Sequence, residues 1–459
     1  MITTKRENYA VVKEIPLVLP QILVPQLDSQ INVPESHCEL IKKKLAEDIP
    51  EQEIYKKLSN TNSLCLELTW RCNMLCSYCA YSGIYKSRRI HQSRNMSIAT
   101  ALKAVDLFFR QITSSYRTIR KTPVVSFYGG EPLLELNSIV RIVDYARKLS
   151  HIYQRDIDFL LTTNGVMLTK EVLKFFVEEN FVIDISLDGP ESEHDRFRIK
   201  SNGNGSFEDV FNNIRYLKKN YPEYFKEKVR FKITLHPLHN LSAIEDFFLS
   251  NDDIFSENNV FISQVVIDES LEEQTRETWA KARENQIETY YNEGENQSWF
   301  FYKLFFESLD LRFQSKGTPL LRQNFKFTGA CFPGEQKIFV DVNGRLLICE
   351  KGMENFPIGN VYNGFDIKVI KKVVTDWRNE IIKRECWDCG YWFFCPMCFA
   401  ANIKDNRFLI TAEDCTQFTE RLKKRIKRYL EHKERRDEMD ANHNTTIIDF
   451  IDSLQPLES

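Results

Sequence analysis

The stretch LCLELTWRCNMLCSYC, residues 64–79, joins an apolar run to three closely spaced cysteines. Residues 64–70 are apolar at almost every position, which predicts a buried strand. Cys72, Cys76 and Cys79 follow directly in the pattern C-x3-C-x2-C. The sequence therefore places three thiols at the carboxyl end of a strand, where the sites of α/β proteins lie.

Outward from this stretch, apolar runs alternate with helical patterns. Besides 64–70, the runs that predict strands are residues 124–128, 159–163, 181–187, 229–235 and 261–267. In the first helical pattern Ile98, Leu102, Val105, Phe109 and Ile112 recur at spacings of three and four residues, as on one helix face. Six strands alternating with helices predict an α/β fold with a parallel sheet, a partial (β/α)6 TIM-like barrel.

The regions flanking this barrel, residues 61–268, have other patterns. Residues 1–60 predict a small N-terminal segment, with Ser36 and Glu39 as a capping box and a second short helix after Pro50. The segment either covers the main domain or recognises a peptide. Further units are predicted as a helical, aromatic bridge over 269–330, a cysteine-rich region with little regular pattern over 331–420, and a charged helix and tail over 421–459.

Charge and hydropathy narrow the classes of partner. The formal net charge of −3 shows no global basic excess, so a nucleic-acid partner is not expected. The apolar segment IPLVLPQILVP, residues 15–25, is too short for a membrane span and contains three prolines. The chain is therefore predicted to be cytoplasmic, without a membrane partner. In a reducing compartment, clustered cysteines predict metal ligands rather than disulfides.

The twelve cysteines are grouped. Ten lie within residues 72–79 and 331–415, whereas Cys38 and Cys65 stand apart and are interpreted as small buried hydrophobes. A structural zinc site at the first group would need a fourth ligand, but His91 is twelve residues beyond Cys79. Three thiolates on a four-iron cluster would instead leave one iron open to bind another molecule.

The first cysteine group resembles the signature of the radical S-adenosylmethionine (radical SAM) superfamily, C-x3-C-x-aromatic-C after the first barrel strand. Tyr78 supplies the aromatic residue. The resemblance implies that Cys72, Cys76 and Cys79 hold a catalytic [4Fe-4S] cluster whose open iron binds S-adenosyl-L-methionine. Reductive cleavage of that cofactor would give a 5′-deoxyadenosyl radical.

Three further strand ends carry motifs of interest. FYGGEP ends the second strand and contains Gly129, Gly130, Glu131 and Pro132. Alone, the motif predicts a tight turn between strand and helix. The resemblance implies that it holds the methionyl amine of the cofactor. TTNG (162–165) ends the third.

The fourth strand ends in SLDGP, residues 186–190. By resemblance, Ser186 is a candidate contact for the cofactor ribose. His194, Asp195 and Arg198 follow, and either face the substrate or form a solvated helix start.

The second cysteine group allows two interpretations. Its members are Cys331, Cys349, Cys386, Cys389, Cys395, Cys398 and Cys415. Paired C-x2-C units alone fit a zinc ribbon as well as iron–sulfur clusters. Behind this barrel the order resembles a SPASM domain, the auxiliary-cluster module of peptide-modifying radical enzymes, although Cys395 and Cys398 are separated by two residues where the family has three.

The SPASM resemblance implies two auxiliary [4Fe-4S] clusters, three clusters in all. One set of ligands is Cys386, Cys389, Cys395 and Cys415, and the other is Cys331, Cys349 and Cys398, which leaves an iron open. The stretches 331–365 and 386–400 resemble maturases of cysteine-rich ribosomal peptides. Asp341, Glu350 and Tyr362 are polar residues near this group without an assigned role.

The implied function is oxidative peptide maturation, in which a peptide radical and a Cys sulfur form an intramolecular thioether. The expected partners are a Cys-containing ribosomal precursor peptide with a leader and an electron donor such as flavodoxin or ferredoxin. An anaerobic sulfatase-maturating enzyme, which converts Cys or Ser to formylglycine, is the enzymatic alternative. A zinc-stapled protein that binds peptides or nucleic acid is the non-enzymatic alternative.

Overall fold

The computed structural model describes residues 42–43, 45–86, 88–113, 122–267, 270–293, 298–309, 331–351, 356–386, 402–404 and 407–439, with a few further residues between them, among them Glu39, Glu354, Cys389, Cys395 and Cys398. Cys38 and the predicted capping box at Ser36 lie outside the described residues. The second predicted helix is present as α3 (Glu51–Leu58), which begins directly after Pro50.

All six predicted barrel strands are present. They are β1 (Ser63–Thr69), β2 (Val124–Gly129), β3 (Asp158–Thr163), β4 (Val182–Ser186), β5 (Val229–Leu235) and β6 (Val260–Gln264). They pair in chain order and every neighbouring pair is parallel. Parallel strands in sequential order need helical crossovers, and together these give the predicted α/β partial barrel.

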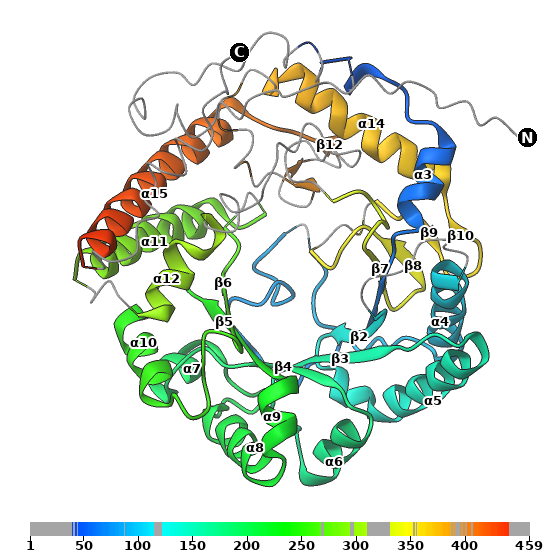
Figure 1. Cartoon of the computed structure of the whole chain (residues 1–459), viewed down its shortest axis with the longest axis horizontal. Coiled ribbons are helices and arrows are strands. Elements are labelled where there is room, and N and C mark those ends of the chain that lie inside the picture. The colour runs from blue at the N-terminus through cyan, green and yellow to red at the C-terminus, as the bar shows by residue number, and fades with distance from the viewer. Residues whose placement is uncertain are drawn as a thin grey trace, which may run out of the picture.

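The crossover helices cover the outer face of the sheet (Figure 1). They are α4 (Ile98–Thr113), η1 (Pro132–Glu135), α5 (Leu136–Tyr153), α6 (Lys170–Glu178), α7 (Glu191–Phe197), α8 (Phe207–Asn220), α9 (Pro222–Lys228) and α10 (Leu241–Ser250). The predicted apolar face of α4 is confirmed, because Val105, Phe109 and Ile112 are fully buried. Side chains that accept from the backbone begin α6 at Thr169 and α10 at Asn240.

The sheet continues into the second cysteine region, where little regular structure was expected. That region contains β7 (Lys337–Val340), β8 (Arg345–Leu347), β9 (Gly359–Asn360), β10 (Gly364–Phe365), α14 (Ile367–Lys383), β11 (Ile403–Lys404), β12 (Arg407–Phe408) and α15 (Ala412–Met439). β7 pairs with β1 in parallel, and β8 to β10 extend the sheet antiparallel. The sheet therefore crosses the division predicted at residue 331.

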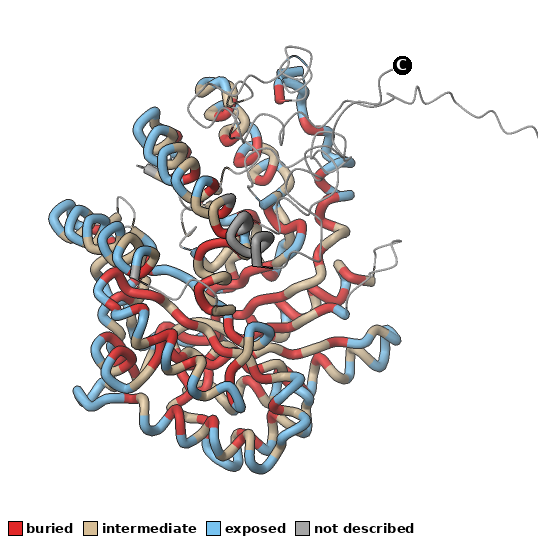
Figure 2. Tube along the Cα trace, turned by 60° about the vertical axis from the view of Figure 1, so that its left-hand side comes forward, coloured by how far each residue is buried: buried red, intermediate tan, exposed pale blue. Residues whose placement is uncertain are grey.

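The elements outside the barrel lie to one side of it. α11 (Glu273–Glu293) and α12 (Trp299–Phe305) follow β6, and α15 lies beside α11 (Figure 1). α14 packs on α3, where Lys371 pairs with Asp48 at 2.7 Å. Buried residues concentrate in the sheet and on the inner helix faces (Figure 2). None of the described helices is long and apolar enough to cross a membrane.

Candidate active site

The first cysteine group lies where it was predicted, in the loop that leaves the carboxyl end of β1. Cys72, Cys76 and Cys79 are half-buried and none forms a disulfide. Two backbone bonds fix the loop from its far side: Leu75 N donates to Ile199 O at 2.8 Å, and Ser77 N donates to Phe197 O at 3.0 Å. The end of α7 and the residues directly after it therefore shape the loop that carries the thiols.

The electrostatics of the three thiols fit a group that binds thiolates. Burial raises the pKa of Cys72 to about 12 and that of Cys76 to about 11, and it also raises the pKa of Cys79. The neighbouring thiols are a lesser cause for Cys72, so the three groups lie close to one another. The chain alone keeps them protonated, whereas a cationic iron–sulfur group would stabilise the thiolates. This donor set fits the predicted cluster.

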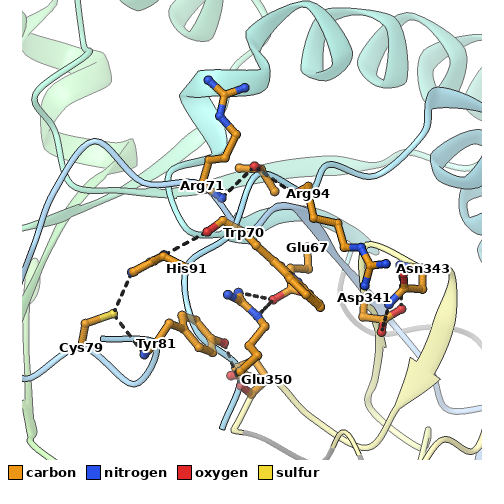
Figure 3. Close-up of polar contacts among 12 residues, drawn as sticks. Glu67, Trp70, Arg71, Cys79, Tyr81, His91, Arg94, Asp341, Asn343 and Glu350 are labelled. Atoms are coloured by element: carbon orange, nitrogen blue, oxygen red, sulfur yellow. Dashed lines mark hydrogen bonds and ion pairs between the residues drawn. The ribbon is translucent and has the colours of Figure 1, made fainter. Parts of the chain in front are cut away.

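Polar groups surround the sulfur atoms. Tyr81 N donates to Cys79 Sγ at 3.4 Å, and His91 Nε2 lies 3.6 Å from the same sulfur. His91 Nδ1 is 2.9 Å from Trp70 O, which orients the ring (Figure 3). Asn164 Nδ2 lies 4.0 Å from Cys72 Sγ. Sequence reasoning missed His91 and Asn164 as sulfur contacts, although Asn164 belongs to a motif that ends a strand.

The two glycines of GGEP let two loop backbones touch. A Cβ on Gly130 would overlap the carbonyl oxygen of Arg71, and one on Gly129 would overlap that of Thr69. Gly129 also has a φ of +133°, which L side chains rarely adopt. Gly130 N donates to Thr69 O at 2.8 Å, continuing the β1–β2 pairing into the cysteine loop. The glycines are thus required by the close approach of the β2 loop to the cysteine loop.

Glu131 joins the loops after β2 and β3. Its Oε1 accepts from Leu133 N at 3.0 Å and Thr163 Oγ1 at 2.8 Å, and its Oε2 accepts from Asn164 N at 2.8 Å. The side chain is buried, and burial raises its pKa. A carboxylate has about four acceptor positions. Three are occupied within the chain, so one remains at Oε2 for a further donor. Pro132, which follows it, is buried at the start of η1.

Tyr78 anchors the cysteine loop to the chain after β4. Its hydroxyl donates to Asp188 Oδ2 and accepts from Arg198 Nη1 at 2.9 Å. Arg198 also lies 3.8 Å from Asp188, whose Oδ1 accepts from Thr234 N. All three side chains are buried, and Arg198 Nε has no hydrogen-bond partner in the described structure. Burial raises the pKa of Cys76, and the Arg198 guanidinium opposes that rise, so a fixed positive charge lies beside the thiols.

His194, Asp195 and Arg198 do not form a solvated helix start. His194 is fully buried, its Nδ1 accepts from Asp188 N at 3.2 Å, and its Nε2 lies 3.0 Å from Ser206 Oγ. Asp195 Oδ1 accepts from Ser206 N and Phe207 N, which caps α8. These two residues therefore support the loop, and of the three only Arg198 borders the thiols. Ser186 ends β4, half-buried, and no described residue hydrogen-bonds its hydroxyl.

The structure brings the later cysteines together in two sets. Cys389, Cys395 and Cys415 all raise the pKa of Cys386, which burial raises to about 12, so these four thiols are neighbours. Burial raises the pKa of Cys349 to about 11, and Glu350 and then Cys398 add to the rise, which makes Cys349 and Cys398 neighbours as well. Cys331 is exposed. Cys65, by contrast, is buried on β1 among Phe339 and Leu347.

A small cavity connects the two cysteine regions. Its walls include Trp70 and Tyr81 from the first loop and Cys349 and Glu350 from the second. Tyr81 OH donates to Glu350 O at 3.3 Å across it (Figure 3). Asp341 and Glu350 face this region but are paired, with Arg345 at 2.7 Å and Lys337 at 3.1 Å. Tyr362 is exposed on the surface.

A buried ion pair lies beside the cavity, and its carboxylate, Glu67, is part of the cavity wall. Glu67 accepts from Arg89 Nε at 2.8 Å and from Trp70 Nε1 at 2.8 Å, and the Arg89 guanidinium lies 3.5 Å from the Tyr81 ring centroid. No local motif marks these residues, because Glu67 and Arg89 meet only when the loop folds back over β1. Among the described residues no group of three or more His, Cys, Asp or Glu is placed to hold a single metal ion.

Residues 66–249 match the family model of the radical SAM superfamily. The match begins in β1 and ends in α10, so it covers the strands and loops just described. Residues 66–249 belong to the radical SAM superfamily. The predicted superfamily is confirmed for this part of the chain, which contains Cys72, Cys76 and Cys79. That these three thiols hold its cluster stays a prediction.

Curated relatives share the radical SAM domain. A cysteine-type anaerobic sulfatase-maturating enzyme of Clostridium novyi (strain NT) is 28% identical over 184 residues, 39% of this chain and 46% of the relative. The radical SAM cyclopropyl synthase TigE of Paramaledivibacter caminithermalis is 28% identical over 153 residues, 33% of this chain and 31% of the relative. The chain thus spans less than half the length of these two relatives.

A solved structure extends the likeness in fold beyond the radical SAM domain. Native anSMEcpe with bound AdoMet superposes with a TM-score of 0.56 over 83% of this chain and 99% of that chain, at 19% identity. At that identity the likeness concerns the fold alone. It covers the partial barrel and reaches into the C-terminal region, consistent with one continuous sheet from β10 to β6.

Proposed function

We propose that the protein is a radical SAM enzyme that removes a hydrogen atom from a ribosomally made peptide and joins a Cys sulfur of that peptide to carbon. The observation that carries the proposal is the cavity between Tyr81, beside Cys79, and Cys349, beside Cys398. Across this small cavity the loop of the radical-generating thiols lies against the loop that carries a second set of thiols, so a peptide bound at this junction would meet both.

The cluster and S-adenosyl-L-methionine, when bound, supply the radical that abstracts hydrogen. The chain's own residues supply orientation. Arg198 offers a buried cation with an unpartnered Nε to a carboxylate, and Glu131 Oε2 keeps one acceptor position for an ammonium group. Ser186 offers a hydroxyl at the end of β4. Tyr78 holds this side of the site rigid through Asp188, which favours a preorganised site.

The second cysteine region supports the sulfur step. Cys349 and Cys398 are neighbours, and Cys331 is exposed. Together these three thiols would leave one iron of a four-iron cluster open to a substrate thiolate. The set around Cys386 would hold a further cluster that accepts the remaining electron. Two auxiliary clusters, a SPASM domain over 331–420 and a leader-binding segment over 1–60 belong to the same proposal.

The second candidate is the anaerobic maturation of sulfatases. It is favoured by the likeness of the radical SAM domain to a sulfatase-maturating enzyme. Both candidates need the same radical chemistry and differ in the fate of the substrate cysteine, because one keeps its sulfur in a thioether and the other loses it to an aldehyde.

The experiment is anaerobic reconstitution with iron and sulfide, followed by incubation with the peptides encoded in neighbouring genes and mass spectrometry. Loss of two hydrogens per crosslink, at a cysteine that no longer reacts with alkylating reagents, is the expected result. Conversion of a thiol to an aldehyde supports the second candidate. A colourless protein that binds zinc but no iron would overturn both.

A further inference from the structure

Helix α15 has one strongly basic face. Six of the eight residues 421–428 are Lys or Arg and none is acidic, in a chain whose formal net charge is −3. Leu422, Ile426 and Tyr429 are buried and attach the helix to the molecule. Arg421, Lys424 and Lys427 are exposed. These three, with Arg428, are called the basic face.

The charge of the basic face is only partly neutralised. Glu288 of α11 pairs with both Lys424, at 2.7 Å, and Arg428, at 2.5 Å, so one carboxylate serves two cations. Arg421 and Lys427 pair with no acidic residue of the described chain. Burial lowers the pKa of Arg283, and Arg421 lowers it further, so Arg283 is another cation close to this surface. The face therefore presents net positive charge to solvent.

The position of the basic face relates it to the thiols. Cys415 lies in the first turn of α15 and belongs to the set around Cys386. Arg421 is six residues further on, which is about 9 Å along a helix axis. Arg283 Nη2 donates to Val265 O at 2.5 Å, and Tyr85 of the cysteine loop donates to the adjacent Val266 O. The face thus lies between one thiol set and the end of β6.

We propose that the basic face of α15 docks an acidic one-electron carrier protein of the flavodoxin type. The inference rests on the proposed function, in which the thiol set around Cys386 holds an iron–sulfur group that takes the remaining electron from the peptide. After turnover that group loses the electron that it took from the peptide, and the oxidised carrier gains it. The same contact runs in reverse when a reduced carrier reduces the resting group, and no bond forms or breaks in either direction. A transient electron-transfer contact needs little buried area, and opposite charges raise its association rate.

The test uses the reconstituted holoenzyme and a purified flavodoxin in its fully reduced form, mixed anaerobically in a stopped-flow instrument. The readout is the rate of flavin oxidation, which does not require peptide turnover. The test variant Arg421→Glu/Lys427→Glu changes the two cations without ion pairs. The matched control, Lys219→Glu/Lys226→Glu, makes the same change in charge at exposed positions of α8 and α9, away from α15 (Figure 1).

At low ionic strength we expect the α15 variant to lower the second-order rate about tenfold or more and the control to stay near wild type. Added salt should lower the wild-type rate towards that of the variant. The neutral variant Arg421→Gln/Lys427→Gln should lie between them. Equal rates in variant and control, or a wild-type rate independent of salt, would overturn the proposal.

Two further arms separate this proposal from its alternatives. Dithionite-driven cleavage of S-adenosyl-L-methionine should be equal in wild type and in the α15 variant. Absence of this cleavage in wild type would contradict the proposed function. The flavodoxin rates would still test the docking surface in that case. A single-stranded RNA that binds wild type but not the variant, with flavodoxin rates unchanged, would assign the basic face to nucleic acid instead.

Discussion

The two cysteine regions are positioned in different ways. The loop of Cys72, Cys76 and Cys79 is framed by backbone bonds from the chain after β2 and after α7, and by the buried side chains of Glu131, Tyr78 and Asp188. The set around Cys386 is positioned by two helix ends: Cys386 follows α14, and Cys415 lies in the first turn of α15. There, Thr411 and Asp414 cap the helix by reciprocal bonds at 3.1 Å.

This difference indicates a division of labour. Hydrogen bonds hold the first loop at the carboxyl edge of a rigid parallel sheet, as expected for a site that must place a reactive group within a narrow tolerance. The second set packs against the core that contains Trp377, Phe399 and Phe408, and in the proposed function it would hold a group that only accepts an electron. The predictions below test whether the two regions fail independently.

The largest effect is expected at the first loop. Changing Cys72, Cys76 and Cys79 together to Ala should abolish formation of 5′-deoxyadenosine under dithionite, because no thiolate remains to hold the cluster. The fold should persist, since the loop is fixed by hydrogen bonds, and far-ultraviolet circular dichroism checks this. Cys65→Ala is the matched control, a buried cysteine outside both groups that should keep cofactor cleavage. Persistence of 5′-deoxyadenosine in the triple variant would contradict the assignment.

A narrower loss is expected at the second set. Cys386→Ala or Cys415→Ala should leave cofactor cleavage near the wild-type level but abolish peptide modification, because these thiols serve the electron acceptor. Liquid chromatography for 5′-deoxyadenosine and mass spectrometry of the peptide measure the two steps separately. Full crosslinking by either variant would show that the second set is dispensable, and the comparison between the regions would then lose its functional meaning.

The glycines of the first loop test its dependence on backbone contact. In Gly130→Ala the new Cβ would overlap Arg71 O, so the β2 loop must move away from the cysteine loop. We expect a cost of about 1–3 kcal/mol in the free energy of unfolding and a loss of bound iron. Gly203→Ala is the control for the overlap, because a Cβ there meets no atom within 4 Å; its φ of +87° adds about 1–2 kcal/mol of backbone strain, so bound iron is the readout that separates the two variants. Iron content and urea unfolding measure both effects, and equal behaviour of the two variants would rule out the close-approach explanation.

Much of the first region could be predicted from sequence, and less of the second. The alternation of apolar runs identified all six barrel strands, and the residues after each strand end identified the loops that meet at Cys72. The hydrogen bonds of Asp188 and Arg89 could not be predicted from the sequence, because each joins segments that are distant in the chain. Likewise β7 is only four residues long, and its partner β1 lies more than 250 residues earlier, so no local pattern reveals the pairing.

One element of the second region had a readable signal. In α14 the buried residues Ile370, Val373, Val374, Trp377 and Ile381 recur at helical spacing, so the periodicity was present in a stretch interpreted as irregular. For the cysteines after α14 the spacing alone left zinc and iron–sulfur interpretations open, since ligand type follows from which thiols meet in space. The neighbours of Cys386 and of Cys349 are given by the fold, not by the C-x2-C units.

The smallest effect is expected at His194, which supports the first loop from behind. Burial lowers the pKa of His194 well below 6.5, so the folded chain keeps it neutral, while the unfolded chain binds a proton below about pH 6.5. Folding stability from this residue is therefore fully present above pH 6.5 and is lost as the pH falls, by up to about 1.4 kcal/mol per pH unit. Urea unfolding at pH 7.5, 6.5 and 5.5 measures the slope of the free energy of unfolding against pH.

His194→Gln should flatten this slope by about one proton, whereas His151→Gln, at an exposed position of α5, should not. An identical slope in both variants would mean that the support behind the first loop does not depend on a neutral imidazole, and the contrast with the second region would then rest on the backbone bonds alone.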